Sequence, residues 1–280
     1  MRYFVTGSRG QLGSALARVI PAGSFVGTDL PELDIRDAEA VRAAIAAARP
    51  DVVIHCAAMT DVDGCALDPN LARAVNAGGT ASVAAGAAAA RAGLVYVGTN
   101  EVFDGALHRP YAETDPPDPV NAYGRTKLEG EVAAARHHDA PWIVRTAWVY
   151  GAGGRNFVHR IREIADAKGA LRVVADEVSS PTWTDELAGA ILRLVERAPR
   201  GVYHLAGLGG CSRLELAKAV LEMTGRGGVP VTPISSAEWP RPSRPPLRTV
   251  LDVGKAASFG VAMLPWREAL SAFLAGERRG

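Results

Sequence analysis

Short apolar runs alternate along the chain with longer segments in which apolar residues recur at helical spacing. The runs are rich in β-branched and aromatic residues, which is typical of strands. They predict strands at Tyr3–Thr6, Phe25–Thr28, Val52–Cys56, Leu94–Gly98, Trp142–Thr146, Arg172–Ala175 and Val202–Leu205. The segments between them predict helices over residues 11–20, 37–48, 70–92, 122–136, 155–168, 184–197 and 212–224. This alternation implies a parallel sheet flanked by helices, and therefore an α/β protein.

The pattern changes after about residue 150. The early strands are apolar at almost every position, as in strands covered on both faces. The alanine-rich run "VAAGAAAARAG" (83–93) predicts a closely packed helix, because alanine is the strongest helix former. Beyond the glycines at 151, 153 and 154, the strands are shorter and more scattered. We therefore expect two domains, over residues 1–150 and mainly 151–280, with the second partly interleaved with the first sheet.

Residues 239–246, "WPRPSRPP", form the richest proline stretch of the chain. Proline lacks the backbone donor that a helix interior or a central strand requires. More patterned sequence follows, so this stretch predicts a loop folded over a cleft and not a linker between domains.

Composition narrows the class of protein. Of the 280 residues, 48% are hydrophobic, and 31 Lys and Arg balance 30 Asp and Glu. The balance argues against a broad electrostatic grip on nucleic acid or an anionic membrane. No apolar run reaches the roughly 18 residues of a membrane-spanning helix. The first residues, "MRYFVTGSRG", lack the apolar stretch of a signal peptide, and we expect a cytoplasmic protein.

No metal or disulfide framework is expected. The three cysteines, Cys56, Cys65 and Cys211, are an odd number and lie far apart in the chain. The adjacent His137 and His138 follow one another on a helix, so their side chains point in different directions. Neither set has the spacing of metal ligands.

Glycines mark the turn after the first predicted strand. "VTGSRGQLG" places Gly7, Gly10 and Gly13 between that strand and the first helix, which is the context of a dinucleotide-binding fingerprint. Residues without a Cβ let backbone amides approach a pyrophosphate, and the helix N-terminus adds about half a positive charge. The alternative is a plain strand–turn–helix connection. We favour nucleotide binding, and with it a Rossmann-type doubly wound parallel sheet.

The coenzyme preference stays open. Asp29 ends the second strand, sixteen residues after Gly13, close to where an acid binds the adenosine ribose. An acid there repels a 2′-phosphate and favours NADH. Arg9 acts in the opposite sense, because a guanidinium in the glycine loop could hold that phosphate of NADPH. A solvent-facing loop residue is the alternative for Arg9.

The third strand runs into small residues. In an open α/β sheet the ligand lies beyond the carboxyl ends of the strands. In "VVIHCAAMT" (52–60), Ala58 would let a cofactor lie close, with Met59 and Thr60 along its path. A simple strand exit is the alternative. His55 lies within the buried strand, and we interpret it as a core histidine with its hydrogen bonds satisfied.

Tyr123 and Lys127 are four residues apart in "NAYGRTKLEGE" (121–131), and Thr99 follows an earlier strand. On a helix, positions i and i+4 share a face, so the phenol and the ammonium would point the same way. A solvated helix face is the alternative for the pair alone. A phenol has a pKa of about 10, and a neighbouring ammonium favours its ionised form. Together these residues predict proton transfer to a carbonyl oxygen, with Thr99 steadying the charge that develops there.

The order of these motifs resembles the extended short-chain dehydrogenase/reductases, and within them the dTDP-4-dehydrorhamnose reductase family. The resemblance runs nearly end to end. It is carried by "GQLG" (10–13), "RPDVVIHCAAMTDVD" (49–63), "TNEVFDG" (99–105), "YGRTKLEGE" (123–131), "RTAWVYG" (145–151), "SPTW" (180–183), "GVYHLAG" (201–207) and "VLD" (250–252).

The resemblance implies an enzyme that reduces the 4-keto group of a nucleotide-activated 6-deoxyhexulose with NADH or NADPH. The C-terminal domain would then bind the substrate, with the active site in the cleft between the domains. Tyr123, Lys127 and Thr99 would be catalytic, and Lys127 would hold the nicotinamide ribose. Further cofactor contacts would come from Gln11, Leu12, Asp34 and Ile35. A small-molecule partner and a homodimer are expected.

Substrate contacts are implied at four further positions. Trp148 would pack against the sugar or its nucleotide, with a core tryptophan as the alternative. Three arginines flank the proline-rich stretch, and the resemblance favours Arg244 for the diphosphate, although an ordinary surface loop is equally consistent. Asn100 and Glu101 would hydrogen-bond sugar hydroxyls; Glu101 could equally be a plain acidic residue beside a helix.

Two departures leave alternatives open. The family has Thr-Asp-Tyr where this chain has Thr99, Asn100 and Glu101, and dehydratases of nucleotide sugars have Thr-Asp-Glu. Glu101 thus resembles the dehydratase base, but Asn100 cannot donate a proton as an acid. Gly64 and Ala66 also replace a Lys and a Glu that are usual in the family. A dehydratase or epimerase, and a non-catalytic NAD(P)-binding regulatory subunit, remain the rival interpretations.

Overall fold

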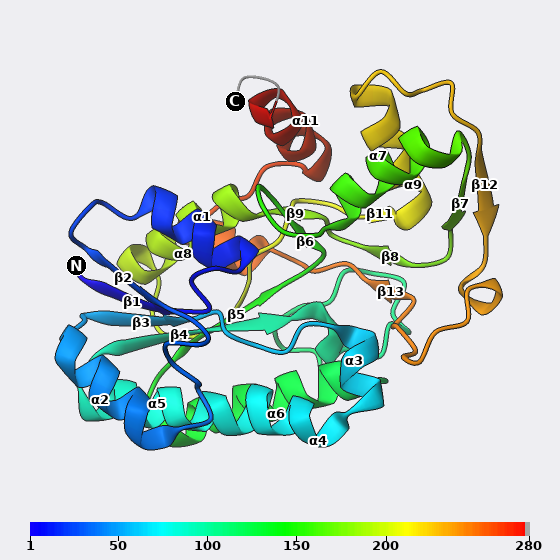
Figure 1. The fold of residues 1–280 in the computed structure, drawn as a ribbon. Helices are drawn as coiled ribbons and strands as arrows, with labels where there is room; N and C mark the ends of the chain where they lie inside the picture. The colour runs from blue at the N-terminus through cyan, green and yellow to red at the C-terminus, as the bar shows by residue number, and fades with distance from the viewer. Residues whose placement is uncertain (278–280) are drawn as a thin grey trace.

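The computed structural model describes residues 1–277, and its centre is a six-stranded sheet (Figure 1). Every neighbouring pair in it is parallel, in the order β2-β1-β3-β4-β5-β10. The strands are β1 (Tyr3–Thr6), β2 (Phe25–Thr28), β3 (Val52–His55), β4 (Gly93–Thr99), β5 (Trp142–Thr146) and β10 (Gly201–His204). The order reverses between β1 and β3, and such a switch point is where open α/β sheets bind ligands.

Helices cover both faces of this sheet, which confirms the doubly wound α/β prediction. In Figure 1, α1 (Gln11–Val19) and α8 (Thr184–Arg197) lie above the sheet. Below it lie α2 (Ala38–Ala48), α5 (Thr80–Ala89) and α6 (Ala122–His137). Each layer has its own apolar core against the strands. Because α8 and β10 come from the second half of the chain, that half contributes to the first sheet as well.

The helix expected over residues 70–92 is interrupted. It consists of α4 (Pro69–Arg73), a π-helical turn η1 (Ala74–Gly79) and α5, and α3 (Val62–Leu67) precedes it. The wide turn places the buried Asn76 where its amide bonds the backbone nitrogen and oxygen of Met59 at 2.8 and 3.1 Å. Such π-turns are frequent at functional sites, and periodicity alone cannot reveal them.

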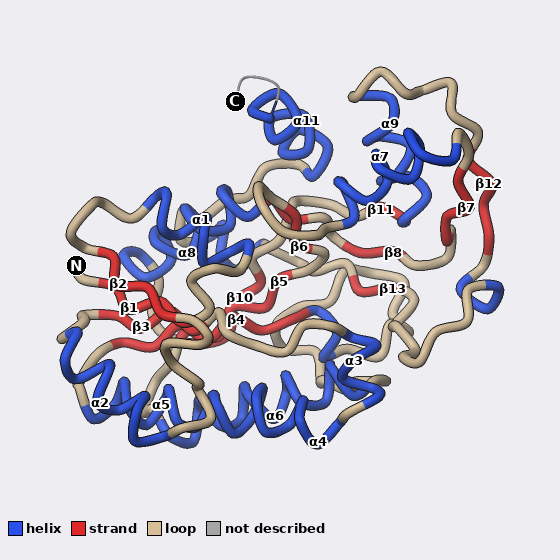
Figure 2. Tube along the Cα trace, in the orientation of Figure 1, coloured by secondary structure: helices blue, strands red, loops and turns tan. Residues whose placement is uncertain are grey.

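A second lobe lies at the upper right of Figure 1, with its own apolar core. Its helices are α7 (Phe157–Lys168), α9 (Arg213–Met223) and α11 (Trp266–Glu277). The short α10 (Gly254–Ser258) instead packs on β10 of the central sheet. Figure 2 shows how short its strands are. They are β6 (Val149–Tyr150), β7 (Leu171–Val174), β8 (Val178–Ser179), β9 (Thr182–Trp183), β11 (Cys211–Ser212), β12 (Val231–Ile234) and β13 (Arg248–Thr249). The boundary at residue 150 stays a prediction, and residues 278–280 of the expected second domain lie outside the described residues.

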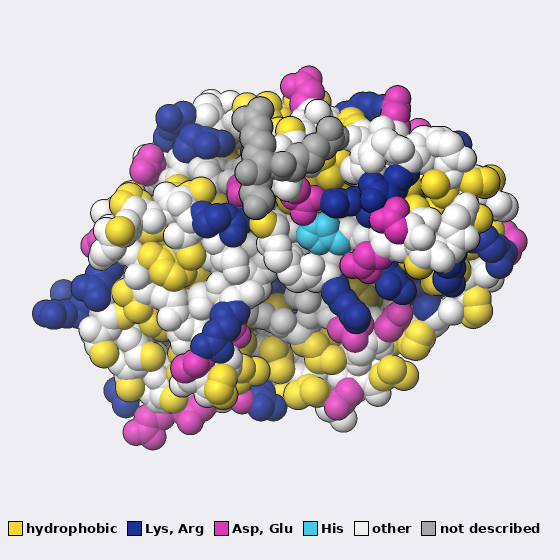
Figure 3. Space-filling view, turned by 45° about the horizontal axis from the view of Figure 1, so that its top comes forward, with side chains coloured by type: hydrophobic (Ala, Val, Ile, Leu, Met, Phe, Trp, Pro, Cys, Tyr) yellow, Lys and Arg dark blue, Asp and Glu magenta, His cyan; other side chains and the backbone are white. Residues whose placement is uncertain are grey.

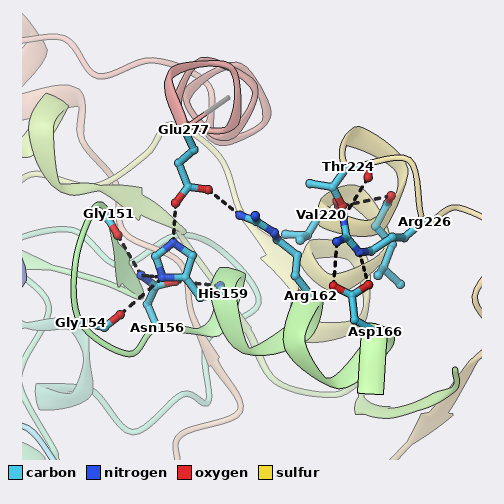
Figure 4. A network of polar contacts seen from close by, with 11 residues as sticks. Gly151, Gly154, Asn156, His159, Arg162, Asp166, Val220, Thr224, Arg226 and Glu277 are labelled. Carbon is cyan, nitrogen blue, oxygen red and sulfur yellow. Dashed lines mark hydrogen bonds and ion pairs between the residues drawn. The ribbon is translucent and has the colours of Figure 1, made fainter. Parts of the chain in front are cut away.

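Polar contacts tie the helices of this lobe together (Figure 4). Glu277 of α11 accepts hydrogen bonds or ion pairs from both His159 and Arg162 of α7. One turn further along α7, Asp166 forms a two-bond ion pair with Arg226, each bond 2.7 Å long. The segment before α7 is fixed by Asn156, which donates to the carbonyl of Gly151 at 2.9 Å. The Glu277 contacts thus join α7 to α11, and the Asp166–Arg226 pair joins α7 to the turn after α9.

The proline-rich stretch is a loop, as predicted, and it reaches back to the first half of the chain. Arg241 pairs with Asp63 of α3 through a 3.1 Å contact, and Ser243 bonds the same carboxylate through its amide and its hydroxyl. The loop therefore connects the second lobe to the helix that follows β3.

The surface carries charges of both signs. On the face in Figure 3, Lys and Arg side chains are interspersed with Asp and Glu, in keeping with the near-zero net charge. Within residues 1–277, no helix is long and apolar enough to cross a bilayer.

Candidate active site

A cleft of about 880 Å³ opens at the carboxyl ends of the central strands. All but one of the site residues expected from the sequence line it. These are Gly7, Gly10, Gln11, Leu12, Gly13, Asp29, Asp34, Ile35, Ala58, Met59, Thr60, Thr99, Asn100, Glu101, Tyr123, Lys127 and Trp148. The cleft thus brings together segments from residue 7 to residue 148, as the parallel topology requires.

The glycine loop is a cradle that side chains would fill. Gly7 has φ +68°, and a Cβ there would lie 2.6 Å from the backbone nitrogen of Ala57. A Cβ at Gly13 would lie 2.2 Å from the carbonyl oxygen of Gly7. Helix α1 begins after Gly10, which has no side chain to cap it. Open amides at a helix N-terminus beside a Cβ-free turn fit the pyrophosphate of a dinucleotide.

Acidic and basic groups alternate at the far end of this cradle. Asp29 accepts a 2.9 Å hydrogen bond from the backbone nitrogen of Arg9. The Arg9 guanidinium is already held by the carbonyl of Leu30 and by Glu32. Asp34 is likewise paired with Arg36, which lowers the pKa of that carboxyl. At the end of the cleft where the ribose would bind, Asp29 thus offers a carboxylate to a ligand. The guanidinium groups of Arg9 and Arg36 are both already bonded to other residues.

Buried hydrogen bonds fix the exit of β3. His55 lies between the hydroxyls of Thr6 and Thr80, at 2.7 and 3.0 Å. Burial lowers its pKa to about 3, with the charge of Lys127 acting in the same direction. A neutral histidine with both ring nitrogens bonded matches the interpretation as a core residue. It holds the strand end from which Ala58 and Met59 enter the cleft wall.

Lys127 is buried and held from several sides. Its Nζ donates to the carbonyl of Val97 at 2.7 Å and lies 4.4 Å from the centre of the Tyr96 ring. The Tyr96 hydroxyl donates to the Lys127 carbonyl at 2.9 Å. Burial lowers the pKa of Lys127 to about 8, although the carboxylate of Glu131 raises it. Glu131 in turn forms a buried ion pair with Arg145.

Tyr123 lies one turn before Lys127 on α6 and lines the same cleft. Burial raises the pKa of its phenol, and the charge of Glu101 raises it further. A hydrogen bond with Thr99 has the opposite, smaller effect on this pKa. Lys127 was expected to lower the pKa of Tyr123, but no such lowering occurs. The Lys127 ammonium is bonded to the Val97 carbonyl, and burial of the phenol disfavours its ionised form. The Tyr123 phenol is therefore protonated at pH 7.

Asn100 and Glu101 have different surroundings. The Asn100 amide donates to the Thr249 hydroxyl at 2.6 Å and its oxygen lies 3.3 Å from the donating Thr99 hydroxyl. Asn100 thus connects the end of β4 to β13 of the second lobe. Glu101 accepts a 2.7 Å bond from Asn121, and burial raises the pKa of its carboxyl. Glu101 is therefore a carboxyl group with a raised pKa on the cleft wall beside Tyr123.

The remaining positions differ from one another. Trp148 has φ +41°, which is rare for a bulky residue, and its ring carries the guanidinium of Arg213 at 3.5 Å. Arg213 also lines the cleft but was not expected from the sequence, because no motif surrounds it. Arg244 is exposed and not part of the lining; its carbonyl accepts a bond from Asn121. No cluster of metal-ligating side chains occurs in the described part of the chain.

Comparisons with known proteins show the family to which the chain is related. The family model described as "RmlD substrate binding domain" matches residues 1–279. A dTDP-4-dehydrorhamnose reductase of Mycolicibacterium smegmatis is 42% identical over 96% of this chain and 84% of its own length. A solved dTDP-4-dehydrorhamnose reductase from Clostridium acetobutylicum has a TM-score of 0.95 and 35% identity, covering 99% and 100% of the two chains. The Bacillus anthracis reductase in complex with NADP has a TM-score of 0.95 and 33% identity, covering 98% and 99%.

Proposed function

The chain belongs to the RmlD substrate binding domain family, and on that basis we propose that it is an NAD(P)H-dependent reductase of nucleotide sugars. Its substrate would be a nucleotide-activated 6-deoxyhexulose, with dTDP-4-dehydrorhamnose reduced to dTDP-rhamnose as the specific reaction. One observation carries the proposal. Thr99, Tyr123 and Lys127 line the same cleft as the glycine cradle, within reach of one ligand at the strand ends.

The residues of the cleft suit the reduction of a ketone. When bound, the dihydronicotinamide supplies a hydride to the carbonyl carbon. The Thr99 hydroxyl would hydrogen-bond the carbonyl oxygen and stabilise the negative charge that grows there. Tyr123 would donate its proton to that oxygen, and its raised pKa keeps it protonated until then. Lys127 is protonated at pH 7, and its ammonium group would hold the ribose of the nicotinamide.

The coenzyme fits the cradle described above. Gly7 and Gly13 would let the pyrophosphate approach the first turn of α1, and Asp29 would accept hydrogen bonds from the adenosine ribose. The relative from Bacillus anthracis is a complex with NADP. We propose NADPH or NADH as coenzyme without a preference, because Asp29 and Arg9 favour opposite choices.

The rival chemistry of a dehydratase is less well supported. Its acid would be the residue at position 100, and the Asn100 amide has no proton of that acidity. That amide is also engaged with Thr249 and, at 3.3 Å, with the Ser179 hydroxyl. The regulatory-subunit alternative has no specific support, because Tyr123 and Lys127 are both present at the cleft wall.

Turnover tests the proposal directly. Purified protein is mixed with dTDP-4-dehydrorhamnose and NADH or NADPH, and coenzyme oxidation is followed at about 340 nm. Tyr123→Phe should lower kcat roughly 10²- to 10⁴-fold, since it removes the proton donor. Tyr203→Phe is the matched control, because its hydroxyl bonds the Pro199 carbonyl away from the cleft. No oxidation with any 4-keto nucleotide sugar, or full activity of Tyr123→Phe, would refute the reductase.

The assembly and location are also proposals. A homodimer is expected, and Val132, half exposed on the outer face of α6, offers an apolar contact for it. Light scattering of the purified protein distinguishes monomer from dimer. A cytoplasmic location is favoured because Cys56, Cys65 and Cys211 are free thiols, which persist in a reducing compartment.

A further inference from the structure

Arg213 is an arginine that the sequence gave no reason to single out. It is the first residue of α9 in the second lobe, and it lines the cleft that holds Tyr123. Its guanidinium lies flat over Trp148, 3.5 Å from the ring centre, with the Phe157 ring at 5.1 Å. Two aromatic rings thus fix the plane of a cationic group at the wall of the cleft.

The protein itself does not saturate this guanidinium. Among the described residues, its ion-pair partner is Glu177, whose carboxylate is 3.5 Å from Nε. Charge-assisted N–H···O bonds are usually about 2.7–2.9 Å long, so this contact is a loose one. Burial lowers the pKa of Arg213, but about a quarter of its side chain remains exposed, and the residue lines the cleft. A guanidinium has five N–H donors, so those that Glu177 does not engage are available to a ligand in the cleft.

The backbone of Trp148 indicates that the stacking is functional. A tryptophan at φ +41° occupies a region that bulky side chains rarely adopt, and such outliers cluster where geometry matters for function. The same residue anchors the second lobe, since its carbonyl accepts a bond from the Thr182 amide. The strained residue therefore presents Arg213 to the cleft and joins the two lobes at that point.

The charges around Arg213 decide which part of a nucleotide sugar it contacts. Glu177 is its partner, and Glu101 is near enough that each charge shifts the pKa of the other group. Arg241, whose charge also lowers the pKa of Arg213, is already paired with Asp63. Two acidic side chains beside this one guanidinium disfavour a diphosphate. They match a neutral sugar, whose hydroxyls accept from Arg213 and donate to Glu101.

We infer that Arg213, held flat by Trp148, hydrogen-bonds a ring hydroxyl of the keto sugar next to the reacting carbonyl, with Glu101 accepting from a hydroxyl. The diphosphate then lies elsewhere in the cleft. This inference rests on the proposed function, and it makes Arg213 a residue that selects the sugar ring and not the nucleotide.

Calorimetry with the product and with its nucleotide alone tests the inference. The protein, Arg213→Gln and Arg213→Lys are titrated with dTDP-rhamnose and with dTDP, which lacks the sugar. Arg267→Gln is the matched control, because Arg267 also lies near a tryptophan and pairs with a glutamate, but is exposed. Thermal unfolding of each variant checks that it is folded.

Loss of a charged hydrogen bond predicts that Arg213→Gln weakens dTDP-rhamnose binding roughly 10- to 100-fold and leaves dTDP binding within about 2-fold. Arg213→Lys should recover part of this loss, since it keeps the charge but not the planar fork. Equal weakening of both ligands would show diphosphate binding and overturn the inference, as would no weakening of either. If the unmodified protein turns over its substrate while Arg213→Gln keeps full sugar affinity, the inference fails alone. If the unmodified protein turns over no keto sugar, the proposed function fails first.

Discussion

Replacing Glu131 by Gln tests how the buried Lys127 is supported. Glu131 lies one turn after Lys127 on α6 and pairs with Arg145 of β5 through contacts of 2.7, 3.0 and 3.2 Å. Both side chains are only 5% exposed. Gly98 makes room for them, because a Cβ there would lie 2.9 Å from the Glu131 carboxylate. This pair is therefore built into the wall that carries Lys127.

The size of the effect follows from burial. Removing one partner of a buried ion pair leaves the other charge uncompensated and costs about 3–5 kcal/mol. We expect about 3 kcal/mol for Glu131→Gln, because glutamine keeps the shape and one acceptor oxygen. The matched control is Glu129→Gln on the same helix. Glu129 also forms two bonds with an arginine, Arg73, but the side chains are 38% and 67% exposed, so the loss should be about 0.2–1 kcal/mol.

Activity gives a second readout. The Glu131 carboxylate raises the pKa of Lys127 against the effect of burial, so its removal lowers that pKa below about 8. The basic limb of the kcat/KM profile, which reports free-enzyme groups, should then move to lower pH. Urea denaturation and pH–rate profiles of both variants measure these effects. Equal destabilisation by the two variants, or a Glu131→Gln profile identical to that of the unmodified protein, would refute the reasoning.

Three further outcomes are expected. Gly13→Ala should abolish coenzyme binding in a fluorescence titration, because its Cβ would lie 2.2 Å from the Gly7 oxygen; Gly228→Ala, with open space around it, should not. Lys127→Met should abolish turnover but raise the free energy of unfolding at pH 7 by about 1–3 kcal/mol. At pH 7 the folded unmodified protein carries a buried ammonium, and the cost of this charge disappears only as the pH rises from about 8 to 10.5. A variant less stable than the unmodified protein would contradict this expectation. His55 is neutral when folded, with a pKa of about 3, so stability should fall as pH drops below 6.5, and His55→Gln should show a shallower fall in acid titrations of unfolding.

The sheet could be predicted from the sequence because its signals are local. Six of the seven predicted strands lie within one residue of a strand of this sheet, since buried parallel strands are short, apolar and β-branched. The seventh lies within one residue of β7, which pairs with β12 in the second lobe. The glycine loop was equally local, with Gly7 and Gly13 set by close backbone contacts. The Tyr123–Lys127 pair needed only helical spacing. Parallel topology then carries these strand ends to one edge, which is why the cleft contains nearly all expected residues.

The missed features depend on contacts between distant segments. The two-residue strands of the second lobe have no period to detect, and the π-turn at Ala74–Gly79 is set by the bonds of Asn76 to Met59. Arg213 reaches the cleft through its stacking on Trp148, a contact across 65 residues of chain. No sequence pattern around Trp148 or Arg213 predicts this contact, because the packing of the two lobes places the guanidinium at the cleft.

The charges of the cleft wall around Tyr123 explain why an amide at position 100 accompanies an acid at position 101. An aspartate at position 100 would bury a second carboxylate next to Glu101, and each charge would disfavour the other. It would also lose the donor that bonds the Thr249 hydroxyl at 2.6 Å. The amide keeps the connection to the second lobe without adding charge. An acid at position 101 is therefore compatible with an amide at position 100. Glu101 can stay beside Tyr123, and with the positively charged Arg213 it can contact the sugar.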